Sequence, residues 1–251
     1  MQVNVNKGSS NHEIALNLAF LNQIDILLIQ EPYIFKQDLS RRITKRHPIY
    51  EAFSPMDDWM AIPRVLTYLR KGVGLKGTQL RPLQHNDPGV SDLLFLSLST
   101  PLNQSILLVN IYNAPPNSTR GEQAVRSLTS LLHSFFPRLT FVAGDLNLHH
   151  HLRQPSYEYS TASAAPFVSW TDSLNLILTS RANEPTQDQG NVLDLAFSTS
   201  ALESLGITTE LSEDLETSSD HRTLLSTVYW DPRHREPPTT LRLPTLTKKS
   251  S

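Results

Sequence analysis

The chain has 251 residues, of which 39% are apolar, and its 22 basic and 24 acidic residues leave a formal net charge of −2. A chain of this length buries roughly three quarters of its unfolded surface, so the composition excludes a protein that is disordered or fibrous throughout. The absence of cysteine excludes disulfides and thiolate metal sites, and suits a reducing compartment. No apolar run approaches the roughly 20 residues of a membrane span.

Short apolar runs predict strands along the whole chain, and segments of helical period separate some of them. The alternation in residues 1–6 predicts a first strand, and Ser10 with Glu13 has the spacing of a capping box for a following helix. Further helices are predicted over residues 121–136 and 162–174. Further strands are predicted, in chain order, at residues 24–30, 65–72, 92–99, 105–112, 139–144, 174–179, 192–198, 206–211 and 223–230.

This element order predicts one layered α/β sandwich, because many strands and few helices leave room for a single core. The predicted domain covers residues 1–230. Residues 231–251 are Pro-rich and charged, so they are predicted to form a flexible linker or tail.

Polar side chains follow two of the predicted strands. Glu31 follows strand 24–30, and Asp145 and Asn147 follow strand 139–144. In an extended chain Asp145 and Asn147 would project from one face, and Gly144 permits a close approach or an unusual backbone angle. An Asx turn that closes the strand is an equally good interpretation of this motif. The histidines at 149–151 are weak zinc candidates, since adjacent residues seldom converge on one metal.

Two aspartates and a histidine near the end of the domain suggest a pair between an acid and an imidazole. Asp194 lies in the middle of predicted strand 192–198, where a buried carboxylate needs a donor partner. Asp220 and His221 directly precede the last strand. A buried aspartate and a histidine at a strand mouth suggest an Asp–His pair, in which the acid fixes the orientation of the imidazole.

Six motifs follow one another between residues 2 and 225, in the order QVNVNKGS, DILLIQEP, VNIYNAPP, GDLNLHH, NVLDLAFS and SSDHRTLL, and the resemblance that they carry covers residues 2–230. Together they resemble the endonuclease/exonuclease/phosphatase superfamily, and most of all the endonuclease domain of LINE-type (non-LTR) retrotransposons of the fungal type. The resemblance implies a deoxyribonuclease I-like fold, a four-layer α/β/β/α sandwich of two mostly antiparallel sheets. It also implies a metal-dependent DNA endonuclease that leaves a 3′-hydroxyl and a 5′-phosphate and so primes reverse transcription.

The resemblance assigns a role to each residue of the catalytic group. Asp145 would activate or orient the attacking water, and Asn147 would help to hold that water or the phosphate. Tyr112 would contact the phosphate or the leaving oxygen. His221 would bind the scissile phosphate, and Asp194 would orient His221.

The resemblance also implies a divalent-metal site. Glu31 would be the principal ligand, with Asn4 at the site and Asp220 near it. Oxygen ligands suit Mg²⁺, with Mn²⁺ as the alternative. Asn6 departs from the pattern, because it stands where the apurinic endonucleases have an acidic residue, and this leaves fewer negative charges around the ion.

Double-stranded DNA is the partner that the resemblance implies, with a reverse transcriptase downstream in the same polyprotein and a nuclear, intracellular location. Because the net charge is slightly negative, local basic patches would have to meet the DNA backbone. Residues 41–47 and 70–76 are the basic segments that could do so, although a solvated loop face is an equally good interpretation. Two other functions stay open. One is a phosphatase of the same fold that acts on small or lipid phosphates, and the other is a non-catalytic, transposon-derived DNA-binding remnant.

Overall fold

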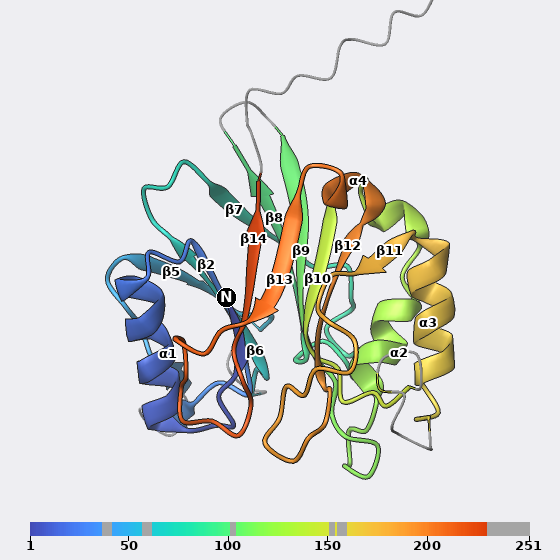
Figure 1. Ribbon diagram of the computed structural model, residues 1–251, viewed down its shortest axis with the longest axis horizontal. Helices are drawn as coiled ribbons and strands as arrows, with labels where there is room; N and C mark the ends of the chain where they lie inside the picture. The colour runs from blue at the N-terminus through green and yellow to red at the C-terminus, as the bar shows by residue number, and fades with distance from the viewer. Residues whose placement is uncertain (37–41, 57–61, 101–103, 151–153, 155–159, 230–251) are drawn as a thin grey trace, which may run out of the picture.

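A computed structural model describes residues 1–36, 42–56, 62–100, 104–150, 154 and 160–229 (Figure 1). The predicted tail at 231–251 therefore lies outside the described residues, as do Trp230, Arg41 and His151. Two six-stranded sheets make up most of the described chain. In spatial order the first sheet contains β13 (Ile207–Leu211), β14 (Leu224–Val228), β1 (Gln2–Asn4), β2 (Ile26–Gln30), β6 (Val65–Arg70) and β5 (Tyr50–Phe53). The second contains β11 (Leu176–Leu178), β12 (Asp194–Thr199), β10 (Thr140–Asp145), β9 (Ser105–Tyr112), β8 (Leu93–Ser99) and β7 (Lys76–Leu80).

The two sheets pack face to face, and helices cover both outer faces. Figure 1 shows α1 (Ser9–Leu21) on the outside of the first sheet, with α2 (Gln123–Thr129) and α3 (Ala164–Ser173) on the outside of the second. The short helix α4 (Ser200–Glu203) follows β12, and the small hairpin of β3 (Ile34–Lys36) and β4 (Arg42–Thr44) stands apart from both sheets. The predicted four-layer α/β/β/α sandwich is confirmed.

Both sheets are mixed, with one parallel pair at each centre. Strands β1 and β2 are parallel in the first sheet, and β9 and β10 are parallel in the second, while the remaining pairs are antiparallel. The carboxyl ends of these four central strands lie at one end of the sandwich, called the site end below. In Figure 1 the site end is the lower one. Loops that follow central strands at a shared edge are a common place for functional side chains.

Several predicted boundaries differ from the structure for local reasons. The capping box is wrong: helix α1 begins after Gly8 without a side-chain cap, and Glu13 pairs with Lys45 instead. The predicted helix 121–136 is reduced to α2 and a 3₁₀ turn at His133–Phe135. The hydroxyls of Thr129 and Ser130 donate to the carbonyls of the preceding turn, which favours helix termination there. Strands β3, β4, β5 and β7 were not predicted, because these short segments lack a run of apolar residues.

The position of Asp194 also differs, since it begins β12 rather than lying within it. The Thr186 hydroxyl accepts the backbone N–H groups of Leu193 and Asp194, so residues before Asp194 belong to a loop. Pairing with β10 then starts at Asp194, directly opposite Asp145.

A buried histidine of α1 is expected to make the fold sensitive to acid. His12 is fully buried, its Nε2 contacts the Tyr68 hydroxyl at 2.9 Å and its Nδ1 accepts the Tyr33 N–H at 3.2 Å. Burial, with a smaller contribution from the charge of Lys45, lowers the pKa of His12 to about 3.

We expect the free energy of unfolding to fall by about 1.4 kcal/mol for each pH unit below 6.5, because only the unfolded chain protonates His12 there. Between pH 6.5 and 4.5 the loss is about 2 kcal/mol. Urea unfolding of the wild type and of His12→Gln at both pH values measures it, and the variant should lose this part of the slope. The exposed His85 provides the control, His85→Gln. Equal slopes for wild type and His12→Gln would contradict the assignment.

Candidate functional site

The layer between the two sheets changes from apolar to polar toward the site end. Strand alternation places every second residue in this layer, so β9 contributes Leu108, then Asn110 and then Tyr112. Strand β10 contributes Ala143 and then Asp145 on the same face. The period that builds the inter-sheet core therefore also delivers a group of buried polar side chains to the site end.

Asp145 lies at the centre of this group and is 1% exposed. Its Oδ2 accepts a hydrogen bond from Asn4 Nδ2 at 2.8 Å, and its Oδ1 accepts the backbone N–H of Asn147 at 3.1 Å. The second contact is an Asx turn, so the two interpretations of the Asp145–Asn147 motif are compatible. The Asn147 side chain donates to the Asn113 carbonyl at 2.9 Å, which folds the loop back against β9. Both oxygens of the Asp145 carboxylate are thereby fixed in position.

His221 approaches Asp145 from the other sheet. Its Nδ1 lies 2.8 Å from Asp194 Oδ2, and its Nε2 lies 4.0 Å from Asp145 Oδ2. The expected Asp–His pair is thus present, formed by Asp194 rather than by the adjacent Asp220. Since the carboxylate of Asp194 accepts from Nδ1, the Nε2 atom of His221 is left facing Asp145.

Glu31 forms a second group beside the first. Its carboxylate Oε1 contacts Lys7 Nζ at 2.8 Å and Arg64 Nη2 at 3.8 Å. The Arg64 guanidinium lies 4.1 Å from the centre of the Tyr112 ring and also reaches Asp92, at 3.7 Å. Tyr112 pairs in register with Asp145 across β9 and β10, so the group around Glu31 lies next to the group around Asp145.

The Glu31 carboxylate fits a divalent cation. Its Oε1 already pairs with one cationic group, the ammonium of Lys7, whose side chain is 69% exposed. Asp220 offers another carboxylate, held by Asn6 and Gln187 at 3.2 Å each. Within the described ranges no group of three or more His, Cys, Asp or Glu side chains is arranged to hold a metal. Mg²⁺ keeps several waters and needs only one or two carboxylates, so this donor set suits it.

Four residues around the site have left-handed backbone angles, namely Asn6, Lys7, Glu31 and Asn147, with φ between 45° and 55°. Each such angle costs roughly 1 kcal/mol or more in a residue with a side chain. Hydrogen bonds hold the strained turns: Lys7 N–H donates to the Glu31 carbonyl at 2.8 Å, and Glu31 N–H donates to the Arg64 carbonyl at 2.8 Å. Strain concentrated where the polar side chains meet is typical of a functional site.

Burial and charge perturb the central ionisable groups. Burial and the nearby Asp194 carboxylate raise the pKa of Asp145, against the opposing effects of His221 and Asn4. Burial alone would lower the pKa of His221, but the carboxylates of Asp194, Asp145 and Asp220 outweigh it and raise that pKa. Burial, followed by the charges of Glu31 and Asp145, also raises the pKa of Tyr112, so this residue is a hydroxyl donor at neutral pH. Perturbed groups in one cluster are a further indication of a functional site.

The structure brings some of the sequence-predicted residues into direct contact and connects Asp220 to them only through other residues. Direct contacts join Asn4, Asp145, Asn147, His221 and Asp194, whereas Asp220 connects to this group through Asn6 and Ser219. Sequence reasoning missed Gln2, Lys7, Arg64 and Asn113. Gln2 had a usable signal, since it alternates with Asn4 in a strand whose other face is apolar. Arg64 had none, because a single arginine before a strand is ordinary.

The histidine motif lies beside the site without joining it. His150 is 7% exposed, and burial lowers the pKa of His149. His151 lies outside the described residues.

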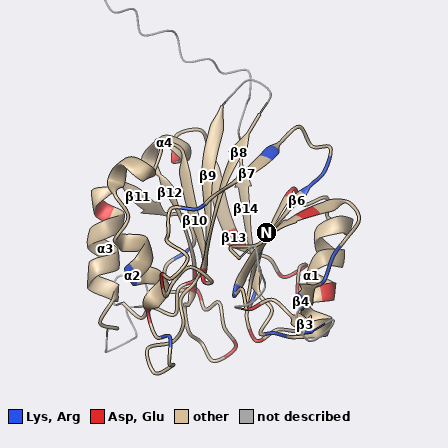
Figure 2. Cartoon of the chain, turned by 180° about the vertical axis from the view of Figure 1, so that it is seen from behind, with Lys and Arg blue, Asp and Glu red and all other residues tan. Residues whose placement is uncertain are grey.

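The two basic segments approach each other at one point, because Arg46 and His47 line the same pocket as Lys71, although β4 itself lies away from the loop after β6 (Figure 2). Strand β6 is antiparallel to β2, with Val65 opposite Gln30 and Leu69 opposite Ile26. Residues 70–76 therefore follow the end of β6 that is remote from Glu31. The described part of segment 41–47 includes β4, whose hairpin with β3 follows Glu31 closely in the chain.

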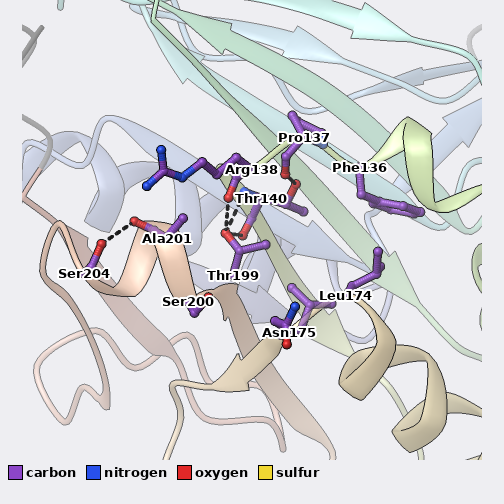
Figure 3. Close-up of a pocket in the computed structure, with 11 residues that line it drawn as sticks. Phe136, Pro137, Arg138, Thr140, Leu174, Asn175, Thr199, Ser200, Ala201 and Ser204 are labelled. Atoms are coloured by element: carbon purple, nitrogen blue, oxygen red, sulfur yellow. Dashed lines mark hydrogen bonds between the residues drawn. The ribbon is translucent and has the colours of Figure 1, made fainter. Parts of the chain in front are cut away.

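The cavity in Figure 3, of about 460 Å³, also lies away from the site. Thr140 and Thr199 line it, and these residues stand at the ends of β10 and β12 opposite to Asp145 and Asp194. Thr199 is engaged with the Arg138 carbonyl at 2.6 Å, as Figure 3 shows. This cavity therefore takes no part in the candidate site.

Comparisons with known proteins agree with the fold. Residues 106–225 match the family described as "Endonuclease-reverse transcriptase". The endonuclease domain of TRAS1, a telomere-specific non-LTR retrotransposon, superposes with a TM-score of 0.70 at 18% identity, covering 91% of this chain and 97% of that one. AP endonuclease LMAP from Leishmania major gives 0.62 at 17% identity, covering 90% and 85%. D. rerio TDP2, complexed with a single-strand DNA product, gives 0.53 at 15% identity, covering 90% and 95%.

No curated protein matches the chain in sequence. Across the described ranges, no helix combines the length and the apolar character needed to cross a membrane.

Proposed function

We propose that the chain is a member of the endonuclease/exonuclease/phosphatase superfamily and a metal-dependent DNA endonuclease that hydrolyses one phosphodiester bond, which the family match over residues 106–225 and the shared fold support. The products would be a 3′-hydroxyl and a 5′-phosphate. The observation that carries this proposal is the buried group at the site end, in which Asp145, His221 and Asp194 lie in contact distance and amides hold the Asp145 carboxylate. Hydrolysis of an anionic diester needs positioned groups and charge neutralisation more than covalent chemistry.

The nucleophile would be a water held by Asp145. Asn4 and the Asn147 N–H fix both carboxylate oxygens, so the remaining lone pairs can orient a water toward the phosphorus. Asn147 would assist through its amide. A positioned acid or base of this kind contributes typically about 10²–10⁴-fold.

The phosphate would be bound by donors on the opposite side. His221, oriented by Asp194 at Nδ1, presents Nε2 to a non-bridging oxygen of the scissile phosphate. Tyr112 donates its hydroxyl to the phosphate or the leaving oxygen. Glu31, with Asn4 and Asp220, would hold Mg²⁺ or Mn²⁺, which when bound neutralises charge on the phosphate and the leaving oxygen.

Double-stranded DNA is the proposed substrate, and basic residues of segment 41–47, which contains β4, would meet its backbone. The match to the family described as "Endonuclease-reverse transcriptase" and the fold of the TRAS1 domain support a role in priming reverse transcription. We accordingly propose a downstream reverse transcriptase as partner and the nucleus as the place of action.

A supercoiled plasmid tests the proposal directly. We expect Mg²⁺ to convert the plasmid to the nicked circle. Excess EDTA should stop the reaction completely, because it removes the metal ion that Glu31 would hold to compensate the charge of the phosphate. A DNA polymerase should extend the nicked product without prior end treatment, since the nick carries a 3′-hydroxyl.

Two other results would contradict the proposal. Release of phosphate from an inositol phosphate, without nicking, would indicate a phosphatase of the same fold. Retention of DNA on the protein in EDTA and in Mg²⁺ alike, without cleavage in either, would indicate a non-catalytic remnant.

A further inference from the structure

Three buried amide side chains connect the Asp194 carboxylate to the backbone of the first sheet. Asp194 Oδ1 accepts from Gln2 Nε2 at 2.9 Å, Gln2 Nε2 also reaches Gln30 Oε1 at 3.3 Å, and Gln30 Nε2 donates to Asn110 Oδ1 at 2.7 Å. We call Gln2, Gln30 and Asn110 the amide relay. All three are at most 3% exposed. None of them touches the place where a substrate phosphate would bind.

The relay crosses the interior of the sandwich. Gln2 and Gln30 stand on β1 and β2, on the inward face where their neighbour Leu28 joins the inter-sheet core, and Asn110 stands on β9 of the other sheet. A buried amide without partners costs about 1–3 kcal/mol. Apolar side chains at these positions would avoid that cost, so the amides need an explanation beyond packing.

The hydrogen bonds of the relay fix its direction, that is, which end of each amide donates and which end accepts. Asn110 Nδ2 faces the carbonyls of Leu66 and Ile29, at 2.9 and 3.3 Å, and carbonyls can only accept. Its Oδ1 must therefore face Gln30, which has to donate through Nε2. Gln30 Oε1 is then left facing Gln2, so that Gln2 in turn has to donate.

As a result, Gln2 Nε2 donates a hydrogen bond to the Asp194 carboxylate. If the Gln2 amide rotated by half a turn, its Oε1 would face two other acceptors, Gln30 Oε1 and Asp194 Oδ1. Instead Gln2 Oε1 is buried without a hydrogen-bond partner in the described structure. The chain thus leaves one oxygen unsatisfied and keeps both Nε2 hydrogens for Gln30 and Asp194.

We propose that the amide relay is a positioning device for His221: it fixes the plane of the Asp194 carboxylate by occupying Oδ1, so that Oδ2 stays on His221 Nδ1. This inference rests on the proposed function for its catalytic consequence, although the contact itself does not. Groups that orient a histidine through its carboxylate partner typically change activity by about 10–100-fold when they are replaced. Gln2, Gln30 and Asn110 are positioning residues, since none contacts the reacting atoms.

Gln2→Met tests the end of the relay, because methionine keeps the volume and removes the donor. We expect kcat for plasmid nicking to fall about 10-fold with KM for DNA unchanged. Gln79→Met is the matched control, because Gln79 Nε2 makes a hydrogen bond to Ser54 O on the edge strand β7, outside the relay. It should leave kcat unchanged.

A spectroscopic measurement on DNA-free, metal-free protein separates positioning from stability. The Nδ1–H proton of His221, assigned by its loss in His221→Ala, should shift or disappear in Gln2→Met and stay in place in Gln79→Met. Gln30→Met should shift it as well, although Gln30 touches neither Asp194 nor His221, and this variant decides the question if Gln2→Met does not fold.

Unchanged Nδ1–H signals in folded Gln2→Met or Gln30→Met would overturn the relay, whatever the nuclease assay shows. A wild-type protein that does not nick DNA but shows the shifted signal in both variants would overturn only the proposed function. The two failures are therefore distinguishable.

Discussion

Asp145→Asn should lower the initial rate of plasmid nicking by about 10²–10⁴-fold while leaving the protein folded. Asparagine keeps the size of the side chain, but it is a far weaker base toward water, and it can accept only one of the two hydrogen bonds that Asn4 and the Asn147 N–H donate to Asp145. His221→Ala should lower the rate to a similar extent, because the phosphate loses the donor that Asp194 orients. Initial rates of nicked-circle formation in Mg²⁺, at saturating DNA, measure both losses.

The double variant makes this prediction sharper. Groups that act in one step are strongly non-additive, so Asp145→Asn combined with His221→Ala should be little slower than either single variant. Asp172→Asn on the exposed face of α3 is the matched control and should nick at the wild-type rate. Near wild-type nicking by either single variant would remove that residue from the catalytic group.

Gly144→Ala should destabilise the protein by about 3 kcal/mol or more. Gly144 has a φ of +155°, and a Cβ atom there would lie 1.8 Å from the Ile111 carbonyl oxygen on the paired strand β9. Backbone atoms of a central strand cannot move aside cheaply, so β9 and β10 would have to separate next to Asp145. Urea unfolding at pH 7.5, above the range in which His12 titrates, measures the change.

Gly72→Ala separates the cost of the clash with the Ile111 carbonyl from the cost of a positive φ in a residue with a side chain. Gly72 also has a positive φ, of +80°, but an added Cβ would meet nothing within 4 Å. It should cost only about 1 kcal/mol, the usual penalty for a side chain at such an angle. If Gly144→Ala were no more destabilising than Gly72→Ala, the close approach of β9 and β10 would not constrain this position.

The fold was largely readable from local patterns. Apolar runs of strand length located the central strands of both sheets, since burial on both faces leaves an uninterrupted apolar signal. The short edge strands β5 and β7 were missed, because half-exposed segments such as Lys76–Leu80 carry no such signal. Helix α2 was overestimated because the periodic leucines continue past Ser130, where hydroxyl groups compete for the backbone carbonyls.

The candidate site was readable as residue types but not as contacts. Glu31, Asp145 and His221 stood out because charged or polar groups at strand ends need partners. The two basic segments looked equivalent in sequence, and only the antiparallel register of β6 against β2 showed that residues 70–76 follow the end of β6 remote from Glu31. Arg64 carried no local signal, although it contacts Glu31 and stacks on Tyr112.

By itself the sequence determined the element types and the order of the polar motifs. It also indicated that Gly144 permits a close approach or an unusual backbone angle beside Asp145. The tertiary structure decided which of those polar groups meet: Asn4 and Asp145 are 141 residues apart, and Gln2 and Asp194 are 192 apart. Local periodicity says that Gln2 and Asn110 leave the apolar pattern, but it does not say what faces them. That depends on how two sheets pack and in which register, and the packing is set by the whole core at once. The direction of the amide relay therefore became visible only when both sheets were in place.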